Sequence, residues 1–360
     1  MLQFIPPIYA SDAIEQAVPD VASARRALGD TAGTIDALCA LQRERFAALA
    51  ADPAGAALLE RTLAALLLCH VRLALRHGSL GEDFHAYHNE GHVAEICDAR
   101  IGRLLTAPGA EALTLRDWCA LLLFGGGHDL QQRRSEAAWS GIGANECASA
   151  LETLRILDAC GFSRSQDADL YLALELMIAG STFDARPLPG AQHLNAADLV
   201  QSGGALAARL DQRLDASAPA WRHCAGAVHG LQLALLAADL DTANVAEPFA
   251  DFAASGERLC REREMLAGRA LDSPASAAPV LGFLTHGQHR FFFELHAFHS
   301  LLGRAAFEAA KRANAPCLKA LTLGVRARVA LAGEPASGAA VLAAYRASVA
   351  SVAADCAAAA

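Results

Sequence analysis

The feature that most constrains the fold is a long run of strong helix formers, 59-LERTLAALLLCHVRLALRH-77, which contains neither glycine nor proline. Leucine and alanine have high intrinsic helix propensities, and a summed preference over a segment of this length is informative. Across residues 11–76, apolar residues recur at intervals of three and four, which is the period of an α-helix. We therefore predict an all-α fold.

The composition is typical of a globular chain with a sizeable core, because 54% of the 360 residues are hydrophobic. The longest apolar runs, 63-LAALLLC-69 and 119-CALLLF-124, are too short to span a bilayer, so we expect buried helices and no membrane. The first residues, MLQFIPPIYASDAIEQ, lack the basic and apolar regions of a secretory signal.

Charge and cysteine usage narrow the classes of partner. The net charge is −9 and the sequence has no basic stripe, so a nucleic-acid partner is not expected. The ten cysteines are scattered without a CxxC pair or a zinc-finger spacing, which favours reduced, buried thiols in a cytoplasmic protein. These features leave a small molecule as the expected partner and say nothing about oligomeric state.

Segments rich in proline and glycine divide the chain, among them 106-TAPGAEALT-114 and 271-LDSPASAAP-279. We expect four parts on this basis: N-terminal helices in 1–76, a central core in 77–210, C-terminal helices packing on that core in 211–335, and an Ala-rich tail in 336–360.

Three histidines gather in 84-FHAYHNEGHVAEI-96, which we predict to lie on a helix reaching about Leu105. His88 and His92 are four residues apart, so on a helix they share one face. His85 is expected to be a surface or loop histidine, and Asn89 a hydrogen-bonding residue on the helix face that supports the site.

Further candidate ligands follow two other helices. His128 and Asp129 stand in 125-GGGHDL-130, and Asp198 stands in 196-AADL-199. Each glycine of the triplet costs a helix about 1 kcal/mol relative to alanine, so the triplet marks either a helix end or a close backbone approach at a site. Imidazoles and carboxylates from three helices can surround one metal such as Zn, Mn or Fe(II).

The blocks YHNEGHVAEI, GGGHDL and AADL, in that order, resemble the HD-domain superfamily of metal-dependent phosphohydrolases. The first block is most similar to class I cyclic-nucleotide phosphodiesterases. The resemblance covers roughly residues 76–205 and implies an HD-domain helical bundle with additional N- and C-terminal helices. It also implies one or two divalent ions per chain (Mn, Mg, Zn or Fe), held by His92, His128, Asp129 and Asp198.

The same resemblance implies catalytic roles. His88 corresponds to the general acid for the leaving oxygen, while Glu146 in 145-NECASA-150 is suited to orient the attacking water or His88. A metal lowers the pKa of bound water from about 15.7 towards 7, which supplies hydroxide. Weaker candidates for contact with substrate are Asn89, Arg133 and Gln288, the arginine because guanidinium binds phosphate in a bidentate manner.

Two departures from the phosphodiesterase pattern leave the substrate and the number of metals open. Gln132 stands where those enzymes usually carry another histidine, and no clear glutamine clamp for a purine is seen. The expected activity is therefore a metal-dependent phosphohydrolase or phosphodiesterase acting on a nucleotide or other small phosphorylated metabolite.

Two other functions are compatible with the sequence. An HD-fold di-iron oxygenase needs two further histidines between the His-Asp pair and the distal aspartate, where only His193 occurs. A catalytically weak helical protein that binds a metal or ligand is the other. The second His-rich stretch, 286-HGQHRFFFELHAFHS-300, is expected to be a core helix whose polar face lines a pocket.

Overall fold

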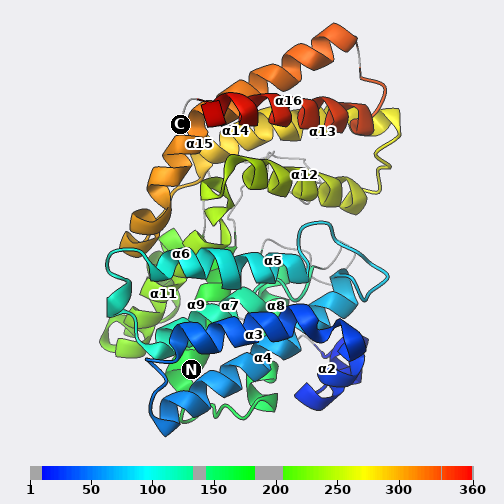
Figure 1. The fold of residues 1–360 in the computed structure, drawn as a ribbon. Helices are drawn as coiled ribbons and strands as arrows, with labels where there is room; N and C mark the ends of the chain where they lie inside the picture. Colours follow the sequence, from blue (N-terminus) through cyan, green and yellow to red (C-terminus); the bar gives the residue numbers. More distant parts are fainter. Residues whose placement is uncertain (1–9, 133–142, 183–205, 334, 359–360) are drawn as a thin grey trace. The chain divides into compact units, whose positions relative to one another are not determined.

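The computed structural model describes residues 10–132, 143–182, 206–333 and 335–358, with side chains as far as residue 354. Every regular element among these residues is a helix, which confirms the all-α prediction (Figure 1). Contacts between residues divide the described chain into two units. Unit 1 contains residues 10–132, 143–182, 206–241 and 299–306, and unit 2 contains residues 242–298, 307–333 and 335–358.

Unit 1 is built from α-helices joined by short 3-10 turns and one π-helical segment, η2. Its elements are α1 (Ala13–Ala17), α2 (Val21–Leu28), η1 (Gly29–Ala32), α3 (Gly33–Phe46), α4 (Pro53–His77), α5 (Glu90–Ala94), η2 (Glu95–Arg100), α6 (Ile101–Leu105), η3 (Ala110–Ala112), α7 (Leu115–Gly127), α8 (Ala144–Ala159), α9 (Ala168–Ser181), η5 (Leu206–Arg209), α10 (Leu210–Ser217), η6 (Trp221–His223) and α11 (Ala225–Asp241).

Unit 2 follows α11 and has two π-helical segments, η9 and η10. Its elements are η7 (Ala243–Ala246), α12 (Phe249–Leu266), η8 (Pro274–Ser276), α13 (Ala277–Gly282), η9 (Phe283–Gly287), α14 (Gln288–Arg290), η10 (Phe291–Leu295), most of α15 (Leu301–Ala332) and α16 (Gly338–Ala358).

This division differs from the four parts expected from the sequence. The N-terminal helices α2 and α3 pack on α4, and α4 in turn packs on α7, so they belong to the same unit as the predicted core. Helix α11 also belongs there, because it packs along α9. The Ala-rich tail forms α16, which packs on α12 and α13, and the buried Tyr345 hydroxyl donates to the Ala253 carbonyl at 3.0 Å.

Helix α4 is the central helix of unit 1. Asp52 caps its N-terminus by accepting hydrogen bonds from two backbone amides of the first turn, and Pro53 occupies the first helical position, where no backbone donor is lost. At 25 residues the helix is longer than its apolar runs suggested, and its length and composition would suffice to cross a membrane. Core helices of soluble proteins pass the same test, and Leu66 and Leu68 are fully buried within the unit.

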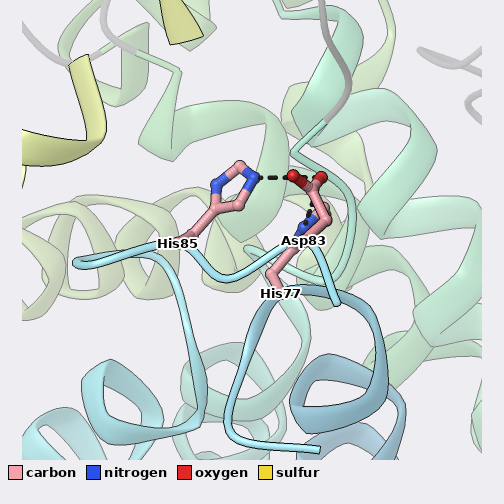
Figure 2. Close-up of side chains that lie close together, drawn as sticks. All are labelled: His77, Asp83 and His85. Carbon is pink, nitrogen blue, oxygen red and sulfur yellow. Dashed lines mark ion pairs between the residues drawn. The ribbon is translucent and has the colours of Figure 1, made fainter. Parts of the chain in front are cut away.

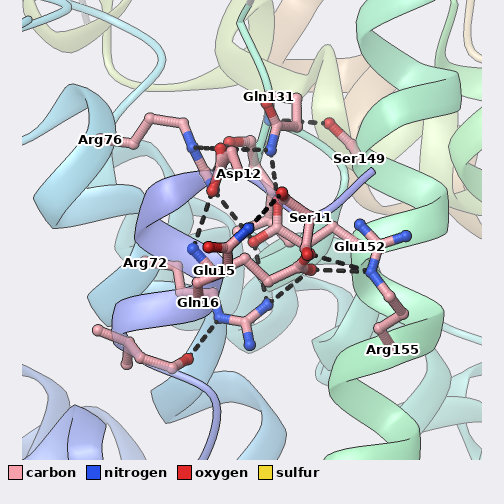
Figure 3. Close-up of polar contacts among 12 residues, drawn as sticks. Ser11, Asp12, Glu15, Gln16, Arg72, Arg76, Gln131, Ser149, Glu152 and Arg155 are labelled. Carbon is pink, nitrogen blue, oxygen red and sulfur yellow. Dashed lines mark hydrogen bonds and ion pairs between the residues drawn. The ribbon is translucent and has the colours of Figure 1, made fainter. Parts of the chain in front are cut away.

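Two arginines of α4 form a buried ion network (Figure 3). Arg72 pairs with Glu15 of α1 at 3.0 Å and with Glu152 of α8 at 3.1 Å. Arg76 pairs with Asp12 at 2.8 Å and with Glu152 at 3.2 Å. A buried charge is tolerated when it is paired and hydrogen-bonded, so each arginine fixes the positions of α1 and α8 relative to α4.

The same network reaches the segment that follows α7. Arg76 donates to the Leu130 carbonyl at 2.6 Å, and the side-chain amide of Gln131 donates to Glu152 at 2.6 Å. The backbone amide of Gln131 donates to the Ser149 hydroxyl at 3.0 Å. The chain immediately after His128 and Asp129 is thus tied to α4 and α8.

The glycine triplet lies inside α7, which stays helical to Gly127. Each glycine faces a different neighbour so closely that an added Cβ atom would collide with it. That atom would lie 2.8 Å from Cys97 Sγ at Gly125, 2.8 Å from Leu66 Cδ1 at Gly126, and 2.3 Å from Thr153 Oγ1 at Gly127. These residues belong to η2, α4 and α8. The triplet therefore forms the end of α7, as one interpretation expected, and it lets three helices pack closely against α7.

Five of the described cysteines fit the expected pattern of buried, free thiols, whereas Cys224 is exposed and Cys147 and Cys160 are half-buried. Cys69, Cys97 and Cys260 are buried, free thiols, and burial raises the pKa of each well above its usual range. Cys317, in contrast, is disulfide-bonded, which differs from the expectation of reduced thiols throughout.

Candidate metal centre

The first histidine block begins in an irregular segment, because residues 78–89 are not helical and α5 starts at Glu90. Asn89 is the N-cap: its side-chain oxygen accepts from the Gly91 amide at 2.8 Å, and its side-chain amide donates to the His85 carbonyl at 2.6 Å. The prediction that His88 and His92 share one helix face is therefore wrong, since a cap residue separates them. These two contacts give the polar atoms of Asn89 a structural role.

His92 on α5 and His128 at the end of α7 come together in the interior of unit 1. Both are 2% exposed, and their ring centroids are 5.6 Å apart. His128 Nδ1 lies 3.1 Å from the Phe124 carbonyl, which can only accept a hydrogen bond. A ring proton is thus assigned to Nδ1, and Nε2 is the nitrogen that can bind a metal ion.

Two carboxylates face these imidazoles. His128 Nε2 lies 3.0 Å from Asp129 Oδ2 and 3.3 Å from Asp241 Oδ1. His92 Nε2 lies 3.3 Å from Asp241 Oδ1 and 3.7 Å from Asp129 Oδ2. Ligands bound about 2.0–2.1 Å from one tetrahedral metal stand roughly 3.3 Å from one another. His92, His128 and Asp241 are therefore close enough together to hold a single metal ion, and Asp129 lies beside both histidines.

The polar atoms of this centre also fit a cation. Among the described residues, the buried His128 Nε2 has no hydrogen-bond partner of acceptable geometry, although two carboxylates lie within 3.3 Å. Burial acts to lower the pKa of His128, but the charges of Asp129 and Asp241 raise that pKa well above its usual range. The carboxylates therefore favour a positive charge at this point, whether a proton or a metal ion.

Asp241 was not among the predicted ligands, and the residue predicted in its place, Asp198, lies outside the described residues. A signal for Asp241 is present, because the tetrapeptide AADL recurs at 237–240 at the end of the apolar helix α11. Asp239, the aspartate within that second copy, has a structural role. Its carboxylate accepts hydrogen bonds from the backbone amides of His299 at 2.7 Å and Ser300 at 2.8 Å.

The residues that hold Asp241 in place were also missed by the sequence analysis. Arg100 at the end of η2 is 2% exposed and donates to the carbonyls of Leu240 at 3.0 Å and Asp241 at 2.6 Å. Its other terminal nitrogen lies 3.6 Å from Glu95 Oε2, which itself lies 3.6 Å from His92 Nδ1. A cation at the C-terminus of a helix is favoured by the helix dipole, so Arg100 steadies the end of α11.

Gln132 contacts Asp129 directly. Its side-chain amide donates to Asp129 Oδ1 at 2.8 Å, and its side-chain oxygen accepts from Asn145 at 3.3 Å. Asp129 therefore presents Oδ2 to the two histidines while Oδ1 is held by Gln132. Hydrogen bonds of this kind orient a ligating carboxylate.

The two predicted catalytic residues lie at the same centre. His88 is half-buried, its ring centroid is 6.2 Å from that of His92, and its charge acts to lower the pKa of Asp129. Burial raises the pKa of Glu146, in the first turn of α8, to about 7, and the charges of Asp129 and Asp241 act in the same direction. A cation between those carboxylates would favour the charged form of Glu146.

The remaining predicted positions are elsewhere. Arg133 and His193 lie outside the described residues. Gln288 is buried inside unit 2, where its amide packs against Gly256 of α12 and hydrogen-bonds Tyr345. These contacts account for Gln288 in structural terms, and its contact with a substrate stays a prediction.

Other histidines of the described chain make ordinary structural contacts. His289 packs on the Phe293 ring, and His296 hydrogen-bonds the Thr242 hydroxyl at 3.0 Å. Between Asp129 and Asp241, the described histidines are the exposed His223 and His229, which add no ligand to the centre. His85, expected to be a surface or loop histidine, lies in the irregular segment 78–89 but is fully buried, and it forms a separate group with His77 and Asp83.

Compared with family models, curated proteins and solved structures, the chain matches none of them. The inference of function therefore rests on the site itself.

Proposed function

We propose that the protein is a metal-dependent phosphoric ester hydrolase that acts on a nucleotide or other small phosphorylated metabolite. One observation carries the proposal: His92, His128 and Asp241 come together from separate segments of the chain at a spacing that suits one metal ion, with Asp129 beside both histidines. Imidazole together with carboxylate suits Zn, Mn or Fe(II). The choice of phosphoric esters follows from the resemblance of the sequence blocks to HD-domain phosphohydrolases.

A divalent ion held by these four side chains would supply Lewis acidity and hydroxide at neutral pH. The chain's own groups do the rest. Arg100 holds the backbone of Asp241, and Glu95 lies beside the ring of His92. Gln132 binds one oxygen of Asp129 and leaves the other facing the histidines. These contacts reduce the reorganisation that is needed when substrate binds.

The two groups beside the ligands have distinct tasks in this proposal. His88, half-buried at the edge of the centre, gives a proton to the leaving oxygen. Glu146, which faces Asp129 and Asp241 from α8, accepts a hydrogen bond from the attacking water and orients it.

The test is hydrolysis of a panel of phosphomonoesters and phosphodiesters by purified protein with Mn²⁺, Mg²⁺, Zn²⁺ or Fe²⁺. We expect turnover with at least one ion, a loss of at least about 100-fold in His88→Gln, and retained metal in that variant. Asp251→Ala, an exposed aspartate on α12, is the matched control and should keep full activity. Tight binding of phosphorylated ligands without turnover under every ion would instead favour a binding protein.

A further inference from the structure

A second group of histidines and aspartate lies in unit 1, outside the proposed metal centre (Figure 2). Asp83 Oδ2 is 3.6 Å from His77 Nδ1 and 3.5 Å from His85 Nε2. The two rings are 4.1 Å apart, and both histidines are buried. By the type and spacing of its side chains alone, this group could hold a second metal ion.

The hydrogen bonding of His77 argues against a metal there. The backbone amide of Gln132 donates to His77 Nε2 at 3.3 Å, so that nitrogen acts as the acceptor. Burial lowers the pKa of His77 to about 4, so the ring is neutral at pH 7 and carries one proton. That proton must sit on Nδ1, the nitrogen that faces Asp83. A nitrogen that carries a proton offers no lone pair to a metal.

His77 and His128 differ in what each ring nitrogen faces. In both rings a proton is assigned to Nδ1. In His128 that nitrogen faces the Phe124 carbonyl, and Nε2 faces the carboxylates. In His77 the lone pair is already taken by the Gln132 amide, and the protonated nitrogen faces the carboxylate. Metal-bound histidines almost always donate their other ring N–H, which His77 cannot do in this arrangement.

His77 connects two parts of the metal centre instead. On one side it holds the segment 78–89, because its carbonyl accepts from the His85 amide at 2.8 Å and its ring packs on the His85 ring. That segment carries His88. On the other side it holds the backbone of Gln132, whose side chain donates to Asp129.

We propose that His77 is a positioning residue, which joins the segment bearing His88 to Gln132 and, through Gln132, sets the orientation of the Asp129 carboxylate. The group of His77, Asp83 and His85 is then a packed junction that holds no metal of its own. This inference rests on the proposed function, since it takes Asp129 as a metal ligand.

The first test reads the position of the ring proton and needs no metal. Long-range ¹H–¹⁵N correlation spectra of ¹⁵N-histidine-labelled full-length protein distinguish the two neutral tautomers, and the His77 signal is identified by its absence in His77→Gln. We expect the Nδ1–H tautomer at pH 7. The Nε2–H tautomer would overturn the proposal, whether or not the protein proves to be a metal enzyme.

The second test measures metal binding by Co²⁺ titration of wild type, His77→Gln and His77→Phe. Glutamine keeps an acceptor for the Gln132 amide, whereas phenylalanine keeps only the ring shape. We expect the number of ions per chain to be the same in all three proteins. Affinity should fall about 10- to 100-fold in His77→Phe, as when residues that orient metal ligands are removed, and stay within a few-fold of wild type in His77→Gln.

Two results would contradict the proposal. Loss of one bound ion per chain in either variant would make His77 a metal ligand, and equal affinity in all three proteins would remove its positioning role. Thermal melting of each protein establishes that it is folded, and if His77→Phe fails to fold, His77→Asn replaces it because the shorter amide cannot reach Gln132. Absence of Co²⁺ binding by the wild type would refute the proposed function, and the tautomer spectrum would still decide the role of His77.

Discussion

At the scale of single residues, the contacts of the two ring nitrogens distinguish the proposed metal ligand His128 from His77. Both histidines are buried beside a carboxylate, but the Nε2 atom of His77 accepts from the Gln132 amide, whereas the Nε2 atom of His128 faces two carboxylates. A sequence records neither tautomers nor partners. It could therefore flag the adjacent pair His128 and Asp129, but it could not show that His85 is buried or that His77 contacts Gln132.

The position of Asp241 also could not be read from the sequence. Asp241 reaches the centre because Arg100 binds the carbonyls at the end of α11, a contact between segments far apart in the chain. The tetrapeptide AADL occurs twice, and Asp241 follows the second copy rather than standing within it, so tertiary packing and not the local pattern identifies this aspartate.

Glu175 gives a residue-scale prediction about pH. It is buried on α9, and burial raises its pKa to about 7 from an unfolded value of 4.5. Below pH 4.5 both states are protonated and folding carries no penalty from this group. As the pH rises from 4.5 to 7, the unfolded state releases its proton first, so stability falls and stays lower above 7.

Glu175→Gln should therefore raise the free energy of unfolding by about 1–3 kcal/mol at pH 8, and by much less near pH 5. Urea unfolding at the two pH values measures the difference. An equal gain at both values would show that the burial of the charge is not the cause.

At the scale of helices, the glycine triplet sets how closely the neighbours of α7 approach it. Gly127→Ala places a Cβ atom 2.3 Å from Thr153 Oγ1, and overpacking in a core costs about 1–3 kcal/mol. We expect net destabilisation despite the better helix propensity of alanine. In contrast, Gly282→Ala, at a helical position with no neighbour within 4 Å, should stabilise by about 0.5–1 kcal/mol. Opposite shifts in the thermal midpoint are the expected result, and equal shifts would contradict the packing argument.

The buried ion network gives a second prediction at this scale. Arg72→Met leaves Glu15 and Glu152 without one of their shared cations, and breaking a buried pair costs about 3–5 kcal/mol. The matched control is Arg25→Met, which breaks an exposed pair with Asp36 and should cost less than about 1 kcal/mol. Chemical denaturation compares them, and a similar small loss in both variants would show that the network does not hold α1, α4 and α8 together.

At the scale of the whole molecule, composition and periodicity were enough to predict an all-α chain, because helix formers dominate it. They did not predict which helices group together. Unit 1 is assembled from separate stretches of sequence, and Asp239 brings residues 299 and 300 into it by accepting their backbone amides. Pro- and Gly-rich segments mark where helices end, but packing decides which helices share a core.

We propose that His92, His128, Asp129 and Asp241 hold one metal ion. The metal content of purified variants tests this proposal. Asp241→Ala and Asp198→Ala are prepared beside wild type, loaded with Mn²⁺ or Zn²⁺, freed of excess metal and analysed for bound ion per chain. We expect that Asp241→Ala loses the ion while Asp198→Ala retains it at the wild-type level. An Asp241→Ala protein that is folded and fully loaded with metal would contradict it.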